Sequence, residues 1–133
     1  MCPSAAPLAG FRLLVVEDDY HIASELGLVL GQAGAVVIGP HPDAESALAA
    51  LARERPDGAV LDIHLGPGIT AYPVADRLEQ MGVPYLFATG NVLRPQDPML
   101  RGRPYLEKPV SDRLLVRSLA QLLAAGEAVP PGR

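Results

Sequence analysis

Cysteine and tryptophan are nearly absent from the 133-residue chain, which has one cysteine, Cys2, and no tryptophan. A single cysteine cannot form a disulfide within the chain, and this favours a protein of a reducing compartment. The chain also lacks a run of about 18 uninterrupted apolar residues, which argues against a membrane-spanning helix. Its N-terminus has neither the basic start nor the apolar core of a signal peptide. We therefore expect a cytoplasmic protein.

Basic residues are also few: the chain has 11 Lys and Arg against 15 Asp and Glu, a formal net charge of −4. This balance argues against nucleic acid or an acidic membrane as the binding partner. Hydrophobic residues make up 49% of the chain and charged residues 20%, which is the composition of a soluble globular protein. We expect one domain over residues 10–125, with flexible tails at 1–9 and 126–133.

Five short apolar runs alternate with longer segments of helical periodicity. This alternation predicts a parallel sheet with helices on both faces and right-handed crossovers. We expect a doubly wound, flavodoxin-like α/β fold with five strands in the order 2-1-3-4-5. The predicted strands are 11–16, 35–39, 58–62, 85–89 and 104–107, and the predicted helices are Tyr20–Gln32, Asp43–Arg55, Ala71–Met81 and Ser111–Ala125.

The segment Asn91–Arg103 interrupts the alternation. It contains Pro95 and Pro98 and has room for one or two helical turns, so we predict a weak helix and a mobile segment there. Arg101 and Arg103 make a small basic spot, which we interpret as part of a solvated loop.

Carboxylates follow two of the predicted strands. Glu17, Asp18 and Asp19 come directly after the first strand, and Asp62 ends the third. In the order 2-1-3-4-5 these strands are neighbours, and their carboxyl ends meet at the edge where open α/β sheets bind ligands. Clustered carboxylates repel one another unless a cation or a proton joins them. The sequence therefore predicts a Mg²⁺ site formed by Glu17, Asp18 and Asp62, with Asp19 as a helix cap.

A hydroxyl and an ammonium group belong at the same edge. Thr89 ends the fourth apolar run, and Lys108 follows the fifth, directly before Pro109. A lysine that neutralises charge and a threonine that donates a hydrogen bond could together hold a phosphoryl group beside the carboxylates. The sequence therefore indicates phosphoryl chemistry at the metal site.

Six residues at four separated places, in this order, carry a resemblance to a known family: Glu17-Asp18, Asp62, Thr89 and Lys108-Pro109. They resemble the response-regulator receiver domain of two-component signalling, over about residues 11–125, and the turn Leu65–Gly68 is also typical of that family. The resemblance implies that Asp62 accepts a phosphoryl group from a phosphohistidine, carried by a sensor histidine kinase or a histidine phosphotransfer protein.

The resemblance also implies a ligand set for the metal. Asp18, Asp62 and the backbone carbonyl of His64 would hold Mg²⁺, and Glu17 would act through metal-bound water. No cofactor besides Mg²⁺ is implied.

The resemblance further implies the residues of a switch. Thr89 and Lys108 would bind the phosphoryl oxygens, and Tyr105 would be the rotamer switch. The Lys108-Pro109 bond is often cis in such domains, which makes a checkable expectation. We expect the face made by 90–105 and the last helix to bind a downstream protein.

A narrower resemblance lies in Val83–Gly90. With Tyr72-Pro73-Val74-Ala75 before it, this segment is similar to stand-alone receivers that carry a Phe-Ala-Thr-Gly-Tyr motif. Asn91 stands where those proteins have the tyrosine, so the aromatic residue next to the threonine is missing. Together with His64, Asn91 flanks the acceptor and could tune how fast water attacks the acyl phosphate.

These observations favour a single-domain response regulator that is not an enzyme and that signals to a protein partner or serves as a phosphate shuttle or sink. One alternative is a receiver-fold adaptor that works without phosphorylation. Another is a haloacid-dehalogenase-like phosphatase, which would need a second aspartate two residues after the nucleophile, where this chain has His64. A DNA-binding regulator is disfavoured by the acidic charge.

Overall fold

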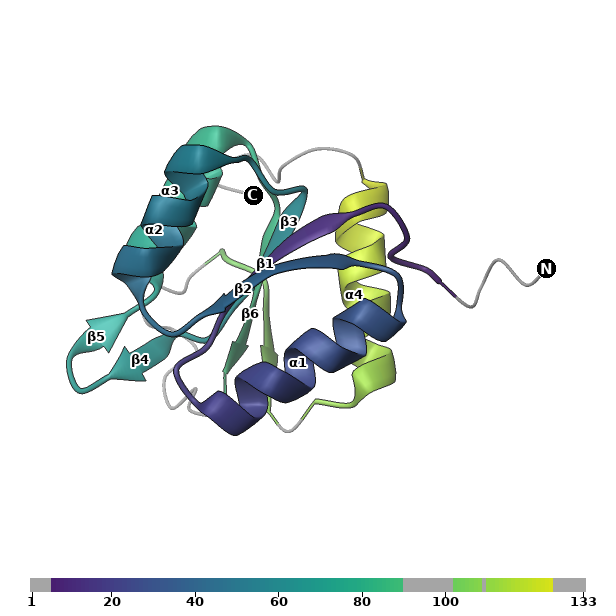
Figure 1. Ribbon diagram of the computed structural model, residues 1–133, viewed down its shortest axis with the longest axis horizontal. Helices are drawn as coiled ribbons and strands as arrows, with labels where there is room; N and C mark the ends of the chain where they lie inside the picture. Colours follow the sequence, from purple (N-terminus) through teal and green to yellow (C-terminus); the bar gives the residue numbers. More distant parts are fainter. Residues whose placement is uncertain (1–5, 90–101, 109, 126–133) are drawn as a thin grey trace.

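A computed structural model of the protein describes residues 6–89, 102–108 and 110–125, and shows a five-stranded parallel sheet (Figure 1). The strand order is β2-β1-β3-β6-β7. This is the predicted order 2-1-3-4-5, because β6 and β7 are the fourth and fifth strands of this sheet along the chain. The strands are β1 (Arg12–Val16), β2 (Val36–His41), β3 (Gly58–Leu61), β6 (Tyr85–Thr89) and β7 (Tyr105–Glu107).

In the part of the chain that the structure describes, helices cover both faces of the sheet (Figure 1). On one face, α1 (Tyr20–Gln32) and α4 (Asp112–Ala124) pack over a core that includes Leu13, Val15 and Leu119. On the other, α2 (Ala44–Arg53) and α3 (Tyr72–Met81) cover a core that includes Leu14, Leu61 and Phe87. Alternate strand residues point to opposite faces, so the continuous apolar runs of β1 and β3 supply both cores. The doubly wound fold is confirmed.

Local signals in the sequence set the helix ends. The side chains of Asp19, Asp43 and Ser111 accept hydrogen bonds from backbone N–H groups in the first turns of α1, α2 and α4, which satisfies donors that a helix leaves free. Proline occupies the first turn of α3, and the helix ends at Gly82, whose φ of 75° is a left-handed conformation that favours glycine.

The structure differs from the predicted elements after the third strand. A two-stranded antiparallel hairpin, β4 (His64–Gly66) and β5 (Ile69–Thr70), precedes α3. The predicted turn lies inside it, and Gly66 and Gly68 have positive φ. The sequence does not predict this hairpin, because β4 and β5 are too short to show the two-residue alternation that indicates a strand. At the base of the hairpin, the Ala71 N–H donates a hydrogen bond to the Ile63 carbonyl.

The packed part of the chain begins earlier than the predicted boundary at residue 10. Leu8 is fully buried, and its N–H donates to the Ala33 carbonyl at 2.8 Å. The predicted weak helix falls largely on residues 90–101, and the predicted cis bond falls on Pro109; both lie outside the described residues. Within the described ranges, the cis peptide bond is Gly39–Pro40. The helices of these ranges include none with the length and apolar character of a membrane span.

Candidate functional site

Three carboxylates meet at the carboxyl edge of the sheet. Val16 and Leu61, the last residues of β1 and β3, are paired in register, and the Asp62 N–H donates to the Val16 carbonyl at 2.9 Å. This pairing sets Asp62 beside Glu17 and Asp18, and one carboxylate oxygen from each of the three lies within 4.8 Å of the others. The sequence prediction that these acids gather is therefore correct in its geometry.

Lys108 reaches this cluster from the end of β7, which is separated from β3 by β6 in the sheet. It follows β7, and its Nζ lies 2.8 Å from Glu17 Oε1 and 3.8 Å from Asp62 Oδ2. Among the residues that the structure describes, it is the cation that forms ion pairs with these carboxylates. We call Glu17, Asp18, Asp62 and Lys108 together the acidic site. Three carboxylates facing one ammonium leave the acidic site with an excess of negative charge.

Burial makes this excess costly. The Glu17 side chain is 1% exposed, and burial raises the pKa of its carboxyl from 4.5 to about 7, although the hydrogen bond to Lys108 works in the opposite direction. Burial also raises the pKa of Asp62, again against the attraction of Lys108. The raised pKa values of Glu17 and Asp62 mean that keeping these carboxylates ionised costs free energy. A bound cation would reduce that cost.

The donor set fits a hard divalent cation. All three acids offer oxygen atoms, the ligands that Mg²⁺ prefers. The two oxygens of Glu17 are already engaged, one by Lys108 and the other by the Asp19 N–H at 3.2 Å. Asp19 itself caps α1, as predicted, through hydrogen bonds from His21 and Ile22. Asp18 and Asp62 are therefore better placed than Glu17 to bind a cation directly.

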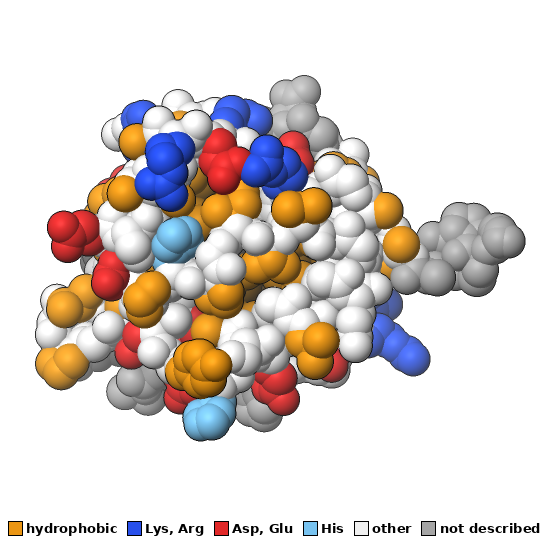
Figure 2. Space-filling view, in the orientation of Figure 1, with side chains coloured by type: hydrophobic (Ala, Val, Ile, Leu, Met, Phe, Trp, Pro, Cys, Tyr) orange, Lys and Arg blue, Asp and Glu red, His pale blue; other side chains and the backbone are white. Residues whose placement is uncertain are grey.

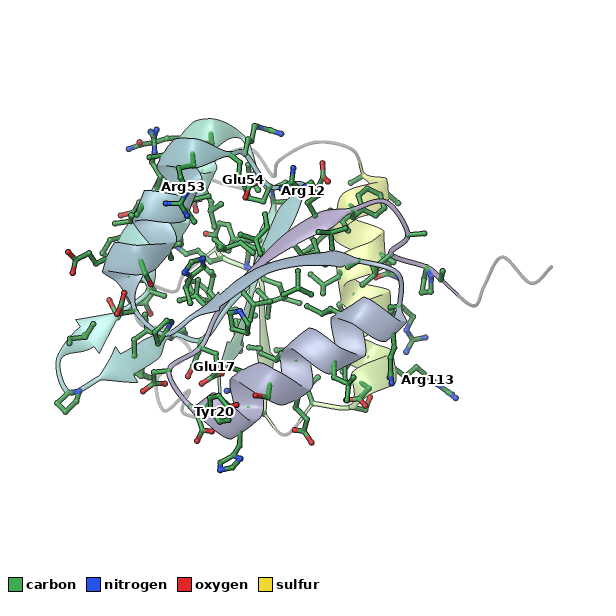
Figure 3. All side chains as sticks on the ribbon, in the orientation of Figure 1. Arg12, Glu17, Tyr20, Arg53, Glu54 and Arg113 are labelled. Atoms are coloured by element: carbon green, nitrogen blue, oxygen red, sulfur yellow. The ribbon has the colours of Figure 1, made fainter. Side chains whose placement is uncertain are left out.

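Figures 2 and 3 place the acidic site in the whole molecule. Glu17 lies at one end of β1, near Tyr20 at the start of α1, whereas Arg12 and Glu54 lie toward the opposite edge of the sheet (Figure 3). Several acidic side chains lie along the lower edge in the view of Figure 2, where α1 begins, and most of the visible basic side chains lie at the upper edge. At the carboxyl edge in this view, the acidic side chains therefore have few basic side chains near them.

The other predicted site residues are placed less completely. His64 is an exposed residue of β4, two positions after Asp62. Thr89 is the last residue of β6 and pairs with Glu107, but its side chain is not among the described ones. Tyr105 begins β7, pairs with Phe87 and is 36% exposed. Their roles in phosphorylation, and that of the His64 carbonyl, stay predictions; Asn91 lies outside the described residues.

The interpretation of Arg103 as part of a solvated loop is wrong. Its side chain is 16% exposed and its Nη2 lies 2.7 Å from Asp76 Oδ1 of α3. The nearby prolines suggested a loop, and no local sequence pattern indicates that Arg103 pairs with an acid 27 residues away. The spacing of Tyr72, Asp76 and Glu79 along one face of α3 was the available signal, but only the tertiary contact reveals what this face binds.

Comparisons with known proteins agree with this geometry. No protein-family model and no curated protein sequence matches the chain, but many solved structures do. The signal receiver domain of a modulated diguanylate cyclase from Desulfovibrio desulfuricans G20 is 30% identical, with a TM-score of 0.74, and the match covers 86% of this chain and 94% of that one. SdrG from Sphingomonas melonis Fr1 is 33% identical, with a TM-score of 0.73 and coverage of 88% and 98%.

A third similar structure contains a metal ion. The receiver domain of the sensor histidine kinase PA1611 from Pseudomonas aeruginosa PAO1 has magnesium coordinated in its active-site cleft; it is 25% identical, with a TM-score of 0.76 and coverage of 87% and 99%. Fold, acidic site and these similarities together show that the chain belongs to the response-regulator receiver domain family. Receiver domains are modules of signalling proteins.

Proposed function

We propose that the protein accepts a phosphoryl group on Asp62 from the phosphohistidine of a sensor histidine kinase or a histidine phosphotransfer protein. One observation carries this proposal: the Asp62 carboxylate lies among Glu17, Asp18 and Lys108 at the carboxyl edge of the sheet, and its charge is incompletely neutralised. The Asp62 side chain is 13% exposed, so it is not fully buried.

Asp18, Asp62 and the carbonyl of His64 would hold Mg²⁺. Glu17 would act through metal-bound water, because its oxygens already accept hydrogen bonds from Lys108 and Asp19. When bound, the cation offsets charge on the transferred group, which is the main requirement of phosphoryl transfer. This assignment agrees with the oxygen-only donor set of the acidic site.

The transfer itself needs little from the protein beyond positioning. An Asp62 carboxylate oxygen attacks phosphorus, an O–P bond forms, and the N–P bond to the donor imidazole breaks, leaving its electron pair on the nitrogen. Lys108 neutralises charge on the phosphoryl oxygens, and Thr89 binds one of them. Attack of water on phosphorus later breaks the O–P bond and returns the carboxylate and inorganic phosphate.

The output of this reaction would be a change of conformation. Thr89 would move toward the phosphoryl group, Tyr105 would change rotamer, and the face made by 90–105 and α4 would bind a downstream protein. A phosphate shuttle or sink would use the same chemistry. The narrower similarity to receivers with a Phe-Ala-Thr-Gly-Tyr motif is part of this proposal, with Asn91 in place of the tyrosine.

The test is the intact-protein mass after incubation with acetyl phosphate and Mg²⁺. We expect one added phosphoryl group in the wild type, none in Asp62→Ala, and none in the wild type after chelation of the metal. Asp57→Asn is a matched control, because Asp57 precedes the same strand that Asp62 follows and instead accepts a hydrogen bond from the Arg12 N–H; it should be modified like the wild type.

A wild-type protein that takes up no phosphoryl group, under conditions that modify a known receiver, would favour the adaptor that works without phosphorylation. Rapid hydrolysis of added phosphomonoesters that depends on Asp62 would instead favour the phosphatase. The exposed His64 lies where such an enzyme needs its second aspartate, and this weighs against the phosphatase.

A further inference from the structure

A second ionic cluster joins α3 to the chain just before β7. Arg103 is its centre: Nη2 lies 2.7 Å from Asp76 Oδ1, and Nε lies 3.9 Å from Glu79 Oε2. The guanidinium also lies over the ring of Tyr72, 5.5 Å from its centroid. The hydroxyl of Tyr85, the first residue of β6, donates to Glu79. We call Tyr72, Asp76, Glu79, Tyr85 and Arg103 the Arg103 cluster.

The Arg103 cluster is connected to the strands of the proposed switch. Arg103 is two residues before Tyr105, the residue that the family resemblance implies as the rotamer switch. Tyr105 is paired in register with Phe87. The Phe87 ring in turn makes edge-to-face contacts with Tyr72 and Tyr85, at centroid distances of 5.6 and 5.4 Å. The position of β7 relative to β6 is therefore linked to α3 by both aromatic packing and an ion pair.

The geometry suits arginine in particular. A guanidinium can bind two carboxylates and stack on an aromatic ring at the same time, which a lysine ammonium cannot do. The two acids stand one turn apart on α3, so that one planar group approaches both. We call this arrangement closed: Arg103 contacts both acids of α3 and the ring of Tyr72 at the same time.

Closure of the Arg103 cluster is incomplete. Nη1 of Arg103 is buried and has no hydrogen-bond partner among the described residues, and Asp76 is 51% exposed on the outside of α3. A half-exposed carboxylate can be hydrated when the ion pair opens, and this lowers the free-energy cost of opening. These features are those of a contact that can open, in contrast to a fully satisfied buried network.

We propose that Arg103 is a positioning residue of the switch: its contacts with α3 hold β7, and with it Tyr105, in the arrangement of the unphosphorylated protein. This inference rests on the proposed function, because it takes Tyr105 as the residue that responds to Asp62. Phosphorylation then competes with the Arg103 cluster, and the strength of the cluster sets how much of the protein is in the active arrangement before phosphorylation.

The test is fluorine NMR of protein labelled with 3-fluorotyrosine. The chain has four tyrosines, and the Tyr105 signal is assigned from Tyr105→Phe. Mg²⁺ with beryllium fluoride, a stable phosphoryl analogue, defines the signal position of the active arrangement in the wild type. In Arg103→Met without the analogue, we expect the Tyr105 signal to shift toward that position, with the equilibrium between the arrangements changed about five-fold or more.

Two further variants separate positioning from simple loss of stability. Asp76→Asn removes the 2.7 Å partner at a half-exposed site and should shift the Tyr105 signal in the same direction, and the double variant should add little, because both changes remove one interaction. Arg103→Lys keeps the charge and should give an intermediate shift. Arg12→Met is the control, since Arg12, the first residue of β1, pairs with Glu54, and β1 is separated from β7 by β3 and β6; its Tyr105 signal should not move.

The outcomes are distinguishable. A Tyr105 signal in Arg103→Met and Asp76→Asn that stays at the wild-type position, while the wild type responds to the analogue, overturns the positioning role and leaves the proposed function intact. A wild type that binds the analogue with no change at Tyr105 overturns the proposed switch and, with it, this inference. A shift in Arg12→Met equal to that in Arg103→Met also overturns the inference, because it would reflect general destabilisation.

Discussion

The acidic site and the Arg103 cluster are both formed by charged residues that are distant in sequence, but their charge balance differs. The acidic site sets three carboxylates against one ammonium, and the pKa values of Glu17 and Asp62 are raised, first of all by burial. In the Arg103 cluster one guanidinium faces two acids, one of them half-exposed and the other hydrogen-bonded to Tyr85. The first arrangement calls for a further cation, whereas the second has a smaller excess of negative charge, part of it on the half-exposed Asp76.

This difference separates a site for chemistry from a contact that sets position. Buried charge that lacks a partner is unstable until a ligand or a proton arrives, so the acidic site should respond strongly to Mg²⁺ and to pH. The Arg103 cluster should respond to neither, and its loss should change the position of β7.

The largest expected effect is a pH dependence of stability that comes from Glu17 in metal-free buffer. Its pKa is raised from 4.5 to about 7, so the folded state binds this proton more tightly than the unfolded chain does. The contribution of Glu17 to stability is complete below pH 4.5 and is lost as the pH rises to about 7. The loss should reach up to about 3 kcal/mol, since each pH unit between the two pKa values contributes about 1.4 kcal/mol.

Urea unfolding of the wild type and of Glu17→Gln between pH 4.5 and 7.5, with a chelator, measures this effect. The stability difference between the two proteins should change over this range, because glutamine does not titrate, and Mg²⁺ should remove most of the change. A constant difference would mean that Glu17 is not buried as a charged group, and would weaken the contrast between the two clusters.

An intermediate effect is expected from one aspartate-to-asparagine change in each cluster. Asp18→Asn should lower the affinity for Mg²⁺ at least about ten-fold, which corresponds to about 1.4 kcal/mol, because the amide keeps one oxygen but loses the charge. Asp76→Asn should leave the affinity unchanged, because Asp76 belongs to the Arg103 cluster. Isothermal titration calorimetry with Mg²⁺ compares the two, and an equal loss in both variants would contradict the separation.

The smallest expected effect concerns the boundary of the acidic site. Asp19→Ala should destabilise the protein by about 1 kcal/mol, the usual effect of losing a helix N-cap, because its Oδ1 accepts hydrogen bonds from the N–H groups of His21 and Ile22. Asp19→Ser should retain most of the stability. Urea unfolding measures both, and a loss of Mg²⁺ binding in Asp19→Ala as large as in Asp18→Asn would place Asp19 among the metal ligands.

Most of the fold was predictable from the sequence, because each strand and helix of the main sheet has a local signal. The helix over Tyr20–Gln32 has the predicted bounds, and Asp43 and Ser111, which begin two of the other predicted helices, cap α2 and α4. The hairpin of β4 and β5 was missed because two- and three-residue strands carry no readable periodicity. The burial of Leu8 was missed because proline and small residues around it are typical of a tail.

The acidic site was predictable for a different reason. Parallel strands bring their carboxyl ends to one edge, so that Glu17, Asp18 and Asp62 could be placed together once the strand order was inferred. The sequence also indicated Lys108, but only the structure gives its preference for Glu17, at 2.8 Å, over Asp62, at 3.8 Å. That preference depends on how far a lysine reaches across two neighbouring strands, which no local pattern encodes.

The sequence by itself determined the strand order, the helix caps and the group of acids at the carboxyl edge, because periodicity, capping residues and strand ends act over a few neighbouring positions. Only the tertiary structure decided that Glu17 is buried enough to shift its pKa and that Arg103 binds α3. Burial and ion pairing depend on which distant segments pack together, here residues 27 positions apart in one cluster and 91 in the other. Contacts of that kind arise only when the whole sheet and its helices assemble.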